Sequence, residues 1–87
     1  MKTCERVHRV SSGRCVIRMW CLSADLRDDE EYDYQHGQIW QRLKTLSAAA
    51  TQPMRAPDVA EVLGKLPFCR AVEVTVGETT VVIRNSL

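Results

Sequence analysis

The sequence predicts an α+β fold in which a four-stranded antiparallel sheet, made of two hairpins, carries two helices on one face. Two observations predict it. Strand-like alternation around a central turn occurs near both ends of the chain, and helix-like apolar spacing occupies the middle. The expected order is strand, strand, helix, helix, strand, strand (ββααββ). With 87 residues, the chain is expected to form a single globular domain, 1–87.

The first hairpin is predicted by the turn-forming residues 11–13 (Ser-Ser-Gly), which separate two segments rich in strand formers, 4–10 and 14–22. Side chains alternate between the two faces of a strand, so the second segment has an apolar face and a mixed face. The apolar face, which is the core candidate, carries Cys15, Ile17, Met19 and Cys21. The mixed face carries Val16, Arg18, Trp20 and Leu22.

The second hairpin is predicted over residues 68–76 and 79–84, joined by the two-residue turn Gly77-Glu78. Alternation assigns one set of side chains to the core: Phe68, Val72, Val74, Val76, Val81 and Ile83. It assigns a second set to the other face: Cys69, Ala71, Glu73 and Thr75. The sequence leaves the order of the four strands within the sheet open.

A first helix is expected from near Glu30 to near Ala50. Its predicted buried stripe, at spacings of three and four residues, is Tyr32, His36, Ile39, Leu43, Leu46 and Ala50, with Trp40 on the flank. An earlier start would bring aspartates onto this stripe, and burying unpaired carboxylates is costly. A second, shorter helix is expected to begin at Pro57 and to bury Val59, Val62, Leu63 and Leu66, before Gly64 and Pro67 limit it.

Charge is strongly polarised along the chain. Residues 1–22 carry five basic residues against Glu5, a net of +4, whereas residues 23–36 carry six acids against Arg27, a net of −5. The acidic segment also contains two tyrosines. We name it the acidic-aromatic run: Asp25, Asp28, Asp29, Glu30, Glu31, Tyr32, Asp33 and Tyr34. Helix capping uses two or three acids, and the surplus predicts either a solvated loop or an interaction surface.

From this run we expect a small non-enzymatic protein-binding domain, an inhibitor or adaptor that occupies a basic groove on a partner protein. Small phage-encoded inhibitors of host or defence proteins often have this size and lack motifs, which by analogy suggests a phage-type inhibitor of a nucleic-acid-binding complex. A homodimer is also open, in which the basic hairpin of one copy meets the acidic-aromatic run of another. The alternative is a nucleic-acid-binding module with a basic and aromatic sheet face formed by Arg6, His8, Arg18 and Trp20.

No catalytic, cofactor or metal motif is recognised. The four glycines are isolated, so no phosphate-binding loop is predicted. The cysteines (Cys4, Cys15, Cys21 and Cys69) lack the paired spacing of zinc or redox sites, which favours reduced and mostly buried thiols. The apolar runs are short and no secretory signal is present, so we expect a cytoplasmic protein without a membrane span.

One stretch of the chain has a family resemblance. From Ala56 to Asn85, a short helix opened by Ala-Pro and closed by Leu66-Pro67 precedes a strand, a turn and a strand. This order resembles the N-terminal domain of Nfu-type iron-sulfur scaffold proteins over about a third of the chain. It implies a metal- or iron-sulfur-related scaffold domain as a further alternative. The Asn-Pro-rich first hairpin of that family is absent, and its cluster-binding cysteine pair has no counterpart here.

Overall fold

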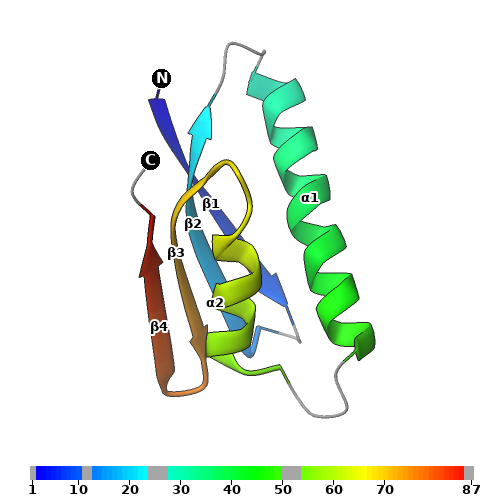
Figure 1. Cartoon of the computed structure of the whole chain (residues 1–87), viewed down its shortest axis with the longest axis vertical. Helices are drawn as coiled ribbons and strands as arrows, with labels where there is room; N and C mark the ends of the chain where they lie inside the picture. Colours follow the sequence, from blue (N-terminus) through cyan, green and yellow to red (C-terminus); the bar gives the residue numbers. More distant parts are fainter. Residues whose placement is uncertain (1, 11–12, 24–27, 50–53, 86–87) are drawn as a thin grey trace.

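The structure, a computed structural model, describes residues 2–10, 13–23, 28–49 and 54–85. Its elements are β1 (Lys2–Val10), β2 (Cys15–Ser23), α1 (Asp28–Ala49), α2 (Ala56–Gly64), β3 (Cys69–Val76) and β4 (Thr79–Arg84). The strands form one antiparallel sheet in the order β1-β2-β3-β4, with both helices on the same side of it (Figure 1). The predicted α+β class and ββααββ order are therefore confirmed.

Two turns set the register of the hairpins. Val10 pairs with Cys15 across the first turn, and Val76 pairs with Thr79 across the second. Each turn contains a glycine with positive φ, 83° at Gly13 and 61° at Gly77, a conformation that other residues adopt only with strain. The glycines thus fix which residues lie opposite each other on neighbouring strands.

The core lies between the sheet and the two helices. The predicted core face of β2 is fully buried, as are Val72 and Val74 on β3. Against these strands α2 packs Val59 and Leu63, and α1 packs Ile39 and Leu43. Within the described ranges, neither helix combines the length and the apolar character needed to cross a membrane.

The register of α1 differs from the prediction. The helix begins at Asp28, two residues earlier than expected, and its buried positions are Glu31, Gln35, Ile39 and Leu43. Tyr32 is 43% exposed, and His36 is only partly buried. The prediction is confirmed at Ile39 and Leu43 but wrong at Tyr32 and His36, because it admitted apolar and aromatic residues alone to the buried stripe. Polar side chains that are hydrogen-bonded to one another can be buried at low cost.

Cys69 is also placed differently from the prediction. It was expected on the sheet face away from the core, but it is fully buried. The cause is an irregularity in the pairing of β2 with β3: Trp20 pairs with Ala71, whereas the next residue, Cys21, pairs with Cys69. Arg70 is therefore an extra residue on β3, a β-bulge, which reverses the alternation and turns Cys69 toward the helices.

Candidate functional site

The side of the sheet away from the helices is uncovered by any described element, and we call it the open face. Two rows of directly paired residues cross it from β1 to β4. One row is Glu5, Trp20, Ala71 and Arg84. The next row is Val7, Arg18, Glu73 and Val82. Side chains within a row are close neighbours, so the first row places an indole and a guanidinium on either side of an alanine.

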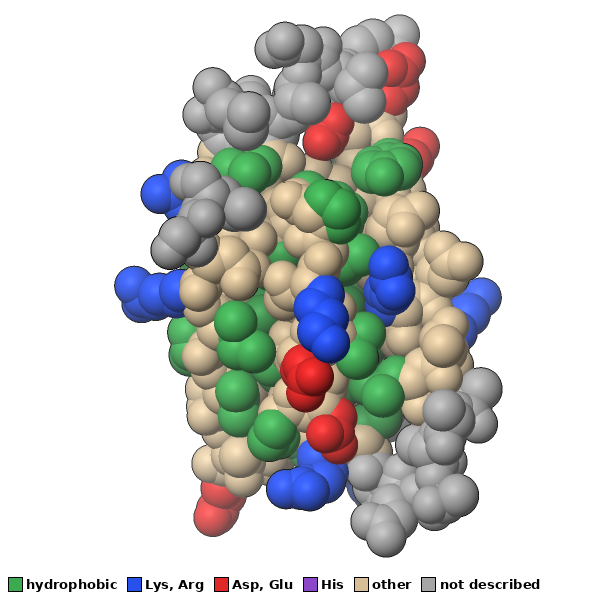
Figure 2. Space-filling view, viewed as in Figure 1, with side chains coloured by type: hydrophobic (Ala, Val, Ile, Leu, Met, Phe, Trp, Pro, Cys, Tyr) green, Lys and Arg blue, Asp and Glu red, His purple; other side chains and the backbone are tan. Residues whose placement is uncertain are grey.

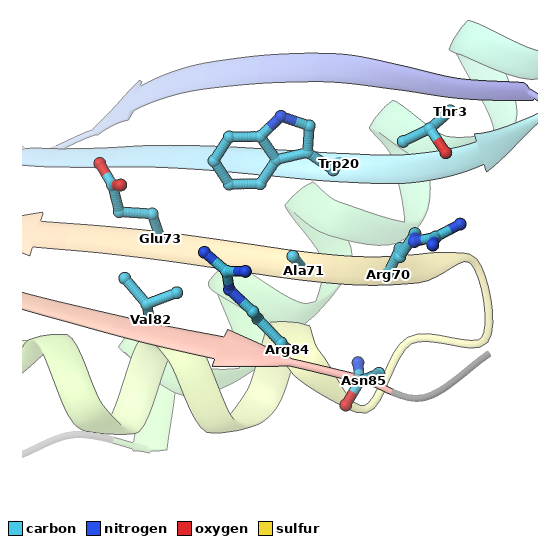
Figure 3. Close-up of a pocket in the computed structure, with 8 residues that line it drawn as sticks. All are labelled: Thr3, Trp20, Arg70, Ala71, Glu73, Val82, Arg84 and Asn85. Carbon is cyan, nitrogen blue, oxygen red and sulfur yellow. The ribbon is translucent and has the colours of Figure 1, made fainter.

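A pocket of about 470 Å³ lies on the open face, and we call it the Trp20 pocket. It is lined by Thr3, Trp20, Arg70, Ala71, Glu73, Val82, Arg84 and Asn85 (Figure 3). Ala71 supplies its floor because a methyl group leaves space between the larger side chains beside it. Figure 3 shows the indole of Trp20 over the sheet on one side and Arg84 reaching across β3 on the other. The pocket therefore combines a flat aromatic wall with cationic groups.

The β-bulge at Arg70 helps to build this pocket. In a regular strand Arg70 and Ala71 would point to opposite faces, but here both line the Trp20 pocket. The side-chain amide of Asn85 donates hydrogen bonds to the carbonyl oxygens of Gly64 (2.9 Å) and Cys69 (3.0 Å), which ties the end of β4 to the bulge. The backbone N–H of Asn85 donates to the carbonyl of Arg70 at 2.8 Å. These bonds hold the cationic end of the pocket in place.

The open face has more positive than negative side chains. Its register assigns it four arginines, Arg9, Arg18, Arg70 and Arg84, and two glutamates, Glu5 and Glu73. The Nε atom of Arg18 lies 3.6 Å from Oε1 of Glu5, and both side chains are about half exposed. This pair contributes little to stability because water screens it. Arg70 and Arg84, which line the pocket, are exposed.

The four residues predicted to form a nucleic-acid-binding face do not share one. Arg18 and Trp20 lie on the open face, as expected. Arg6 and His8 pair with Met19 and Ile17, two core residues, and so lie on the helix side of the sheet. The reason is the register of the first hairpin, because a slip of one residue moves every side chain of a strand to the other face.

Arg6 instead belongs to a hydrogen-bonded network between β1, β2 and α1, centred on Gln35. Its Nε donates to Oε1 of Gln35 at 3.2 Å. The Gln35 amide in turn donates to the backbone oxygen of Leu22 and to Oε1 of Glu31, both at 2.8 Å. Gln35 is 1% exposed and Glu31 is 6% exposed, so the network is part of the protein interior. It fixes the N-terminal half of α1 on the sheet.

An aromatic cluster extends the contact between β1 and α1, and we call this contact region the seam. The His8 and His36 ring centroids are 5.2 Å apart, and Trp40 lies edge-on to both rings, at 6.3 and 6.0 Å. Tyr32 stacks on His36 at 5.4 Å, and the guanidinium carbon of Arg6 lies 4.9 Å from the centre of the Tyr32 ring. Nε2 of His8 and Nδ1 of His36 are buried, and neither has a hydrogen-bond partner among the described residues. Burial, then His36 and then Arg6 lower the pKa of His8.

The acidic-aromatic run is divided by the fold. Asp25 lies outside the described residues, as do the side chains of Asp28 and Asp29. Glu31 is held in the Gln35 network, whereas Glu30 and Asp33 are exposed. Tyr34 is 56% exposed and lies edge-on to Phe68, with ring centroids 6.2 Å apart. Figure 2 shows acidic side chains gathered at the end of the molecule where α1 begins. Among the described side chains of the run, Glu31 is therefore withdrawn from the surface, whereas Asp33 and Tyr34 are exposed.

The four cysteines are free thiols, of which Cys15, Cys21 and Cys69 are buried and Cys4 is partly buried. Burial raises the pKa of all three buried thiols, to about 12 for Cys21 and about 11 for Cys69. Such groups stay protonated at neutral pH, and the protonated thiol is a poor nucleophile and a poor metal ligand. In ranges 2–10, 13–23, 28–49 and 54–85, no three His, Cys, Asp or Glu side chains are arranged to hold one metal ion.

Comparisons with known proteins gave no match, whether with protein-family models, with curated proteins or with solved structures. The resemblance of residues 56–85 to the Nfu-type N-terminal domain gains no support from them. The geometry of this chain is therefore the basis for inferring its function.

Proposed function

We propose that this chain is a non-enzymatic binding domain whose Trp20 pocket holds single-stranded nucleic acid. The observation that carries the proposal is the placement of one indole and two arginines around a single pocket on a sheet face that no described element covers. In such a site the indole stacks on a base, and the guanidinium groups contact phosphate oxygens. The sequence predicted the same kind of binding as an alternative, a nucleic-acid-binding sheet face. The residues proposed to bind are now Trp20, Arg70 and Arg84.

Charge on the open face agrees with an anionic ligand. Two of the four arginines line the pocket against one glutamate, Glu73, and the other glutamate, Glu5, is paired with Arg18. The formal charge of the whole chain is +1, so attraction to nucleic acid depends on this local excess and not on a global field. Modest affinity with a shallow salt dependence is therefore expected.

Replacing Trp20 with alanine is expected to weaken the binding of a fluorescein-labelled oligo(dT) by about 5- to 150-fold. This range corresponds to the roughly 1–3 kcal/mol that one base stacked on an aromatic side chain contributes. Fluorescence anisotropy at low salt measures the dissociation constant. Arg84→Gln should also weaken binding and should reduce the slope of log affinity against log salt by about 0.7, the value for one phosphate contact to a single strand.

Two matched variants serve as controls for this experiment. Tyr34→Ala removes an exposed aromatic ring from α1, and Arg55→Gln removes an exposed cation next to α2. Neither residue lines the pocket, so both should bind like the wild type. The proposal is wrong if the wild type does not bind the oligonucleotide, or if Trp20→Ala and Tyr34→Ala weaken binding equally.

A second candidate function is docking of the acidic-aromatic run on a basic partner protein, as an inhibitor or adaptor. The observation that favours it is the 56% exposure of Tyr34 beside the exposed Asp33. A large exposed ring next to a carboxylate is typical of contact surfaces that combine an aromatic anchor with charge. It ranks second because Glu31 and Tyr32 of the same run are engaged within the protein.

The double variant Asp33→Asn/Tyr34→Ala is expected to lose most of the affinity of the chain for a labelled oligoarginine peptide, because it removes both the charge and the anchor. Affinity should be measured by anisotropy at two salt concentrations, since contacts between exposed charges weaken as salt rises. Glu78→Gln, which neutralises an exposed acid in the β3–β4 turn, is the control. Equal losses in the two variants would mean non-specific attraction and would eliminate this candidate.

A further inference from the structure

The two edges of the sheet differ in how well they are protected against pairing with a strand of another chain. Edge strand β1 carries four charged residues, Lys2, Glu5, Arg6 and Arg9. Edge strand β4 reads Thr-Thr-Val-Val-Ile-Arg, with five β-branched residues and a single charge at its end. Charged side chains on an edge strand discourage pairing with another chain, whereas an uncharged β-branched edge favours it. The β4 edge is therefore the sheet edge that is less protected against pairing with another chain.

The backbone of β4 offers hydrogen-bonding groups at alternate residues. Asn85 directs its N–H to β3, where it donates to the carbonyl of Arg70 at 2.8 Å. Successive residues of a strand direct these groups to opposite sides, so residues 79, 81 and 83 also face β3. Thr80, Val82 and Arg84 consequently direct their N–H and C=O groups to the free edge. No other described strand pairs with that edge.

Thr80, Val82 and Arg84 can pair with the same three residues of a second copy of the chain. If a second β4 runs antiparallel to the first about a two-fold axis at Val82, then Val82 lies opposite Val82 and Thr80 lies opposite Arg84. In this register every backbone group on the free edge meets a partner, and the only charge of the strand faces a threonine instead of its own copy. On the helix side, the partly buried Val81 lies opposite Ile83. The exposed Val82, at 49%, would be covered.

We infer that β4 is an interaction edge through which two copies of this chain pair, forming one continuous antiparallel sheet. Symmetric pairing of this kind is closed, because the same strand is used on both copies. The open faces of the two copies then lie on the same side of the joint sheet. Since Val82 and Arg84 also line the Trp20 pocket, the two pockets become neighbours across the axis.

Light scattering coupled to gel filtration tests this inference on the full chain. The wild type is expected to have twice the 9.9 kDa mass of the chain at high concentration, with dissociation on dilution. Val82→Lys brings two ammonium groups together at the axis and should halve the measured mass. Val7→Lys places the same charge at an exposed valine on the opposite edge strand and should leave the dimer intact. Circular dichroism confirms that both variants are folded.

A cysteine variant tests the register itself. In the proposed pairing the two Val82 Cα atoms are about 5.5 Å apart, a separation that a disulfide can span. Val82→Cys should therefore form a covalent dimer on mild oxidation, and Val7→Cys should not. A wild type that stays monomeric at all concentrations overturns the inference. It is also overturned if Val7→Lys dissociates the dimer while Val82→Lys does not, or if Val82→Cys fails to cross-link.

Discussion

Gln35→Leu is expected to lower the free energy of unfolding by about 3 kcal/mol, because a buried polar group that loses its partner costs about 1–3 kcal/mol. Leucine has nearly the same size as glutamine, so the effect comes from lost hydrogen bonds. Three groups are affected: Nε of Arg6 loses its acceptor, and the Glu31 carboxylate and the Leu22 carbonyl each lose a donor. Urea denaturation followed by circular dichroism measures the change.

A control and a double variant make this prediction specific. Gln41→Leu changes an exposed glutamine on the same helix, and it should alter stability by less than about 0.5 kcal/mol. Glu31→Leu combined with Gln35→Leu also removes the carboxylate that Gln35→Leu alone leaves without its donor. Replacing both members of a buried pair with apolar groups is often nearly neutral, so the double variant should be more stable than Gln35→Leu alone. If Gln35→Leu is as stable as Gln41→Leu, the network does not hold α1 to the sheet.

The Gln35 network also explains which part of the fold the sequence could predict. Strands, turns and the order of elements depend on local alternation and on glycines at turns, and these predictions are confirmed. The buried face of α1 depends on which polar side chains find partners on distant strands, here Leu22 on β2 and Arg6 on β1. Hydropathy assigns Gln35 and Glu31 to solvent. Only their three-dimensional neighbours show that they are buried.

Only some of the features that form the Trp20 pocket could be predicted from the sequence. Arg18 and Trp20 were placed correctly on the outward face of their strand, and the tight turn at Gly77 implies that Ala71 lies opposite Arg84. Two further conditions are non-local. The pocket requires β2 and β3, which are separated by both helices in the sequence, to be neighbours in the sheet. It also requires the bulge at Arg70, for which the alternating pattern of β3 gives no signal.

The wrong placement of Arg6 and His8 follows from the composition of β1. The observed burial of His8 also affects the stability of the protein. Their strand has charged or polar residues on both faces, so its composition does not specify which face is buried. Pairing of His8 with Ile17 places this face of β1 toward the helices. It brings the titratable His8 ring into the interior, where it is 7% exposed. A histidine that must stay neutral to remain buried makes folding sensitive to pH.

Acidification is therefore expected to destabilise this protein as the pH falls below about 6.5, the pKa of an unperturbed histidine. Burial lowers the pKa of His8 in the folded state, with smaller contributions from His36 and Arg6. The unfolded chain then binds the proton more readily than the folded one. Stability is fully present above the unfolded pKa and decreases until the pH reaches the lowered folded pKa. Urea midpoints measured between about pH 8 and pH 5 would record the loss.

His8→Phe identifies the responsible group. Phenylalanine retains an aromatic ring next to Trp40 and opposite Ile17, but it cannot accept a proton. The other charged or titratable groups of the seam remain in this variant: Arg6 on β1, and Glu31, Tyr32 and His36 on α1. If His8 is the sensor, stability changes less with pH in the variant than in the wild type. A pH dependence as steep as that of the wild type would show that His8 contributes nothing to the acid sensitivity, and the prediction would be wrong.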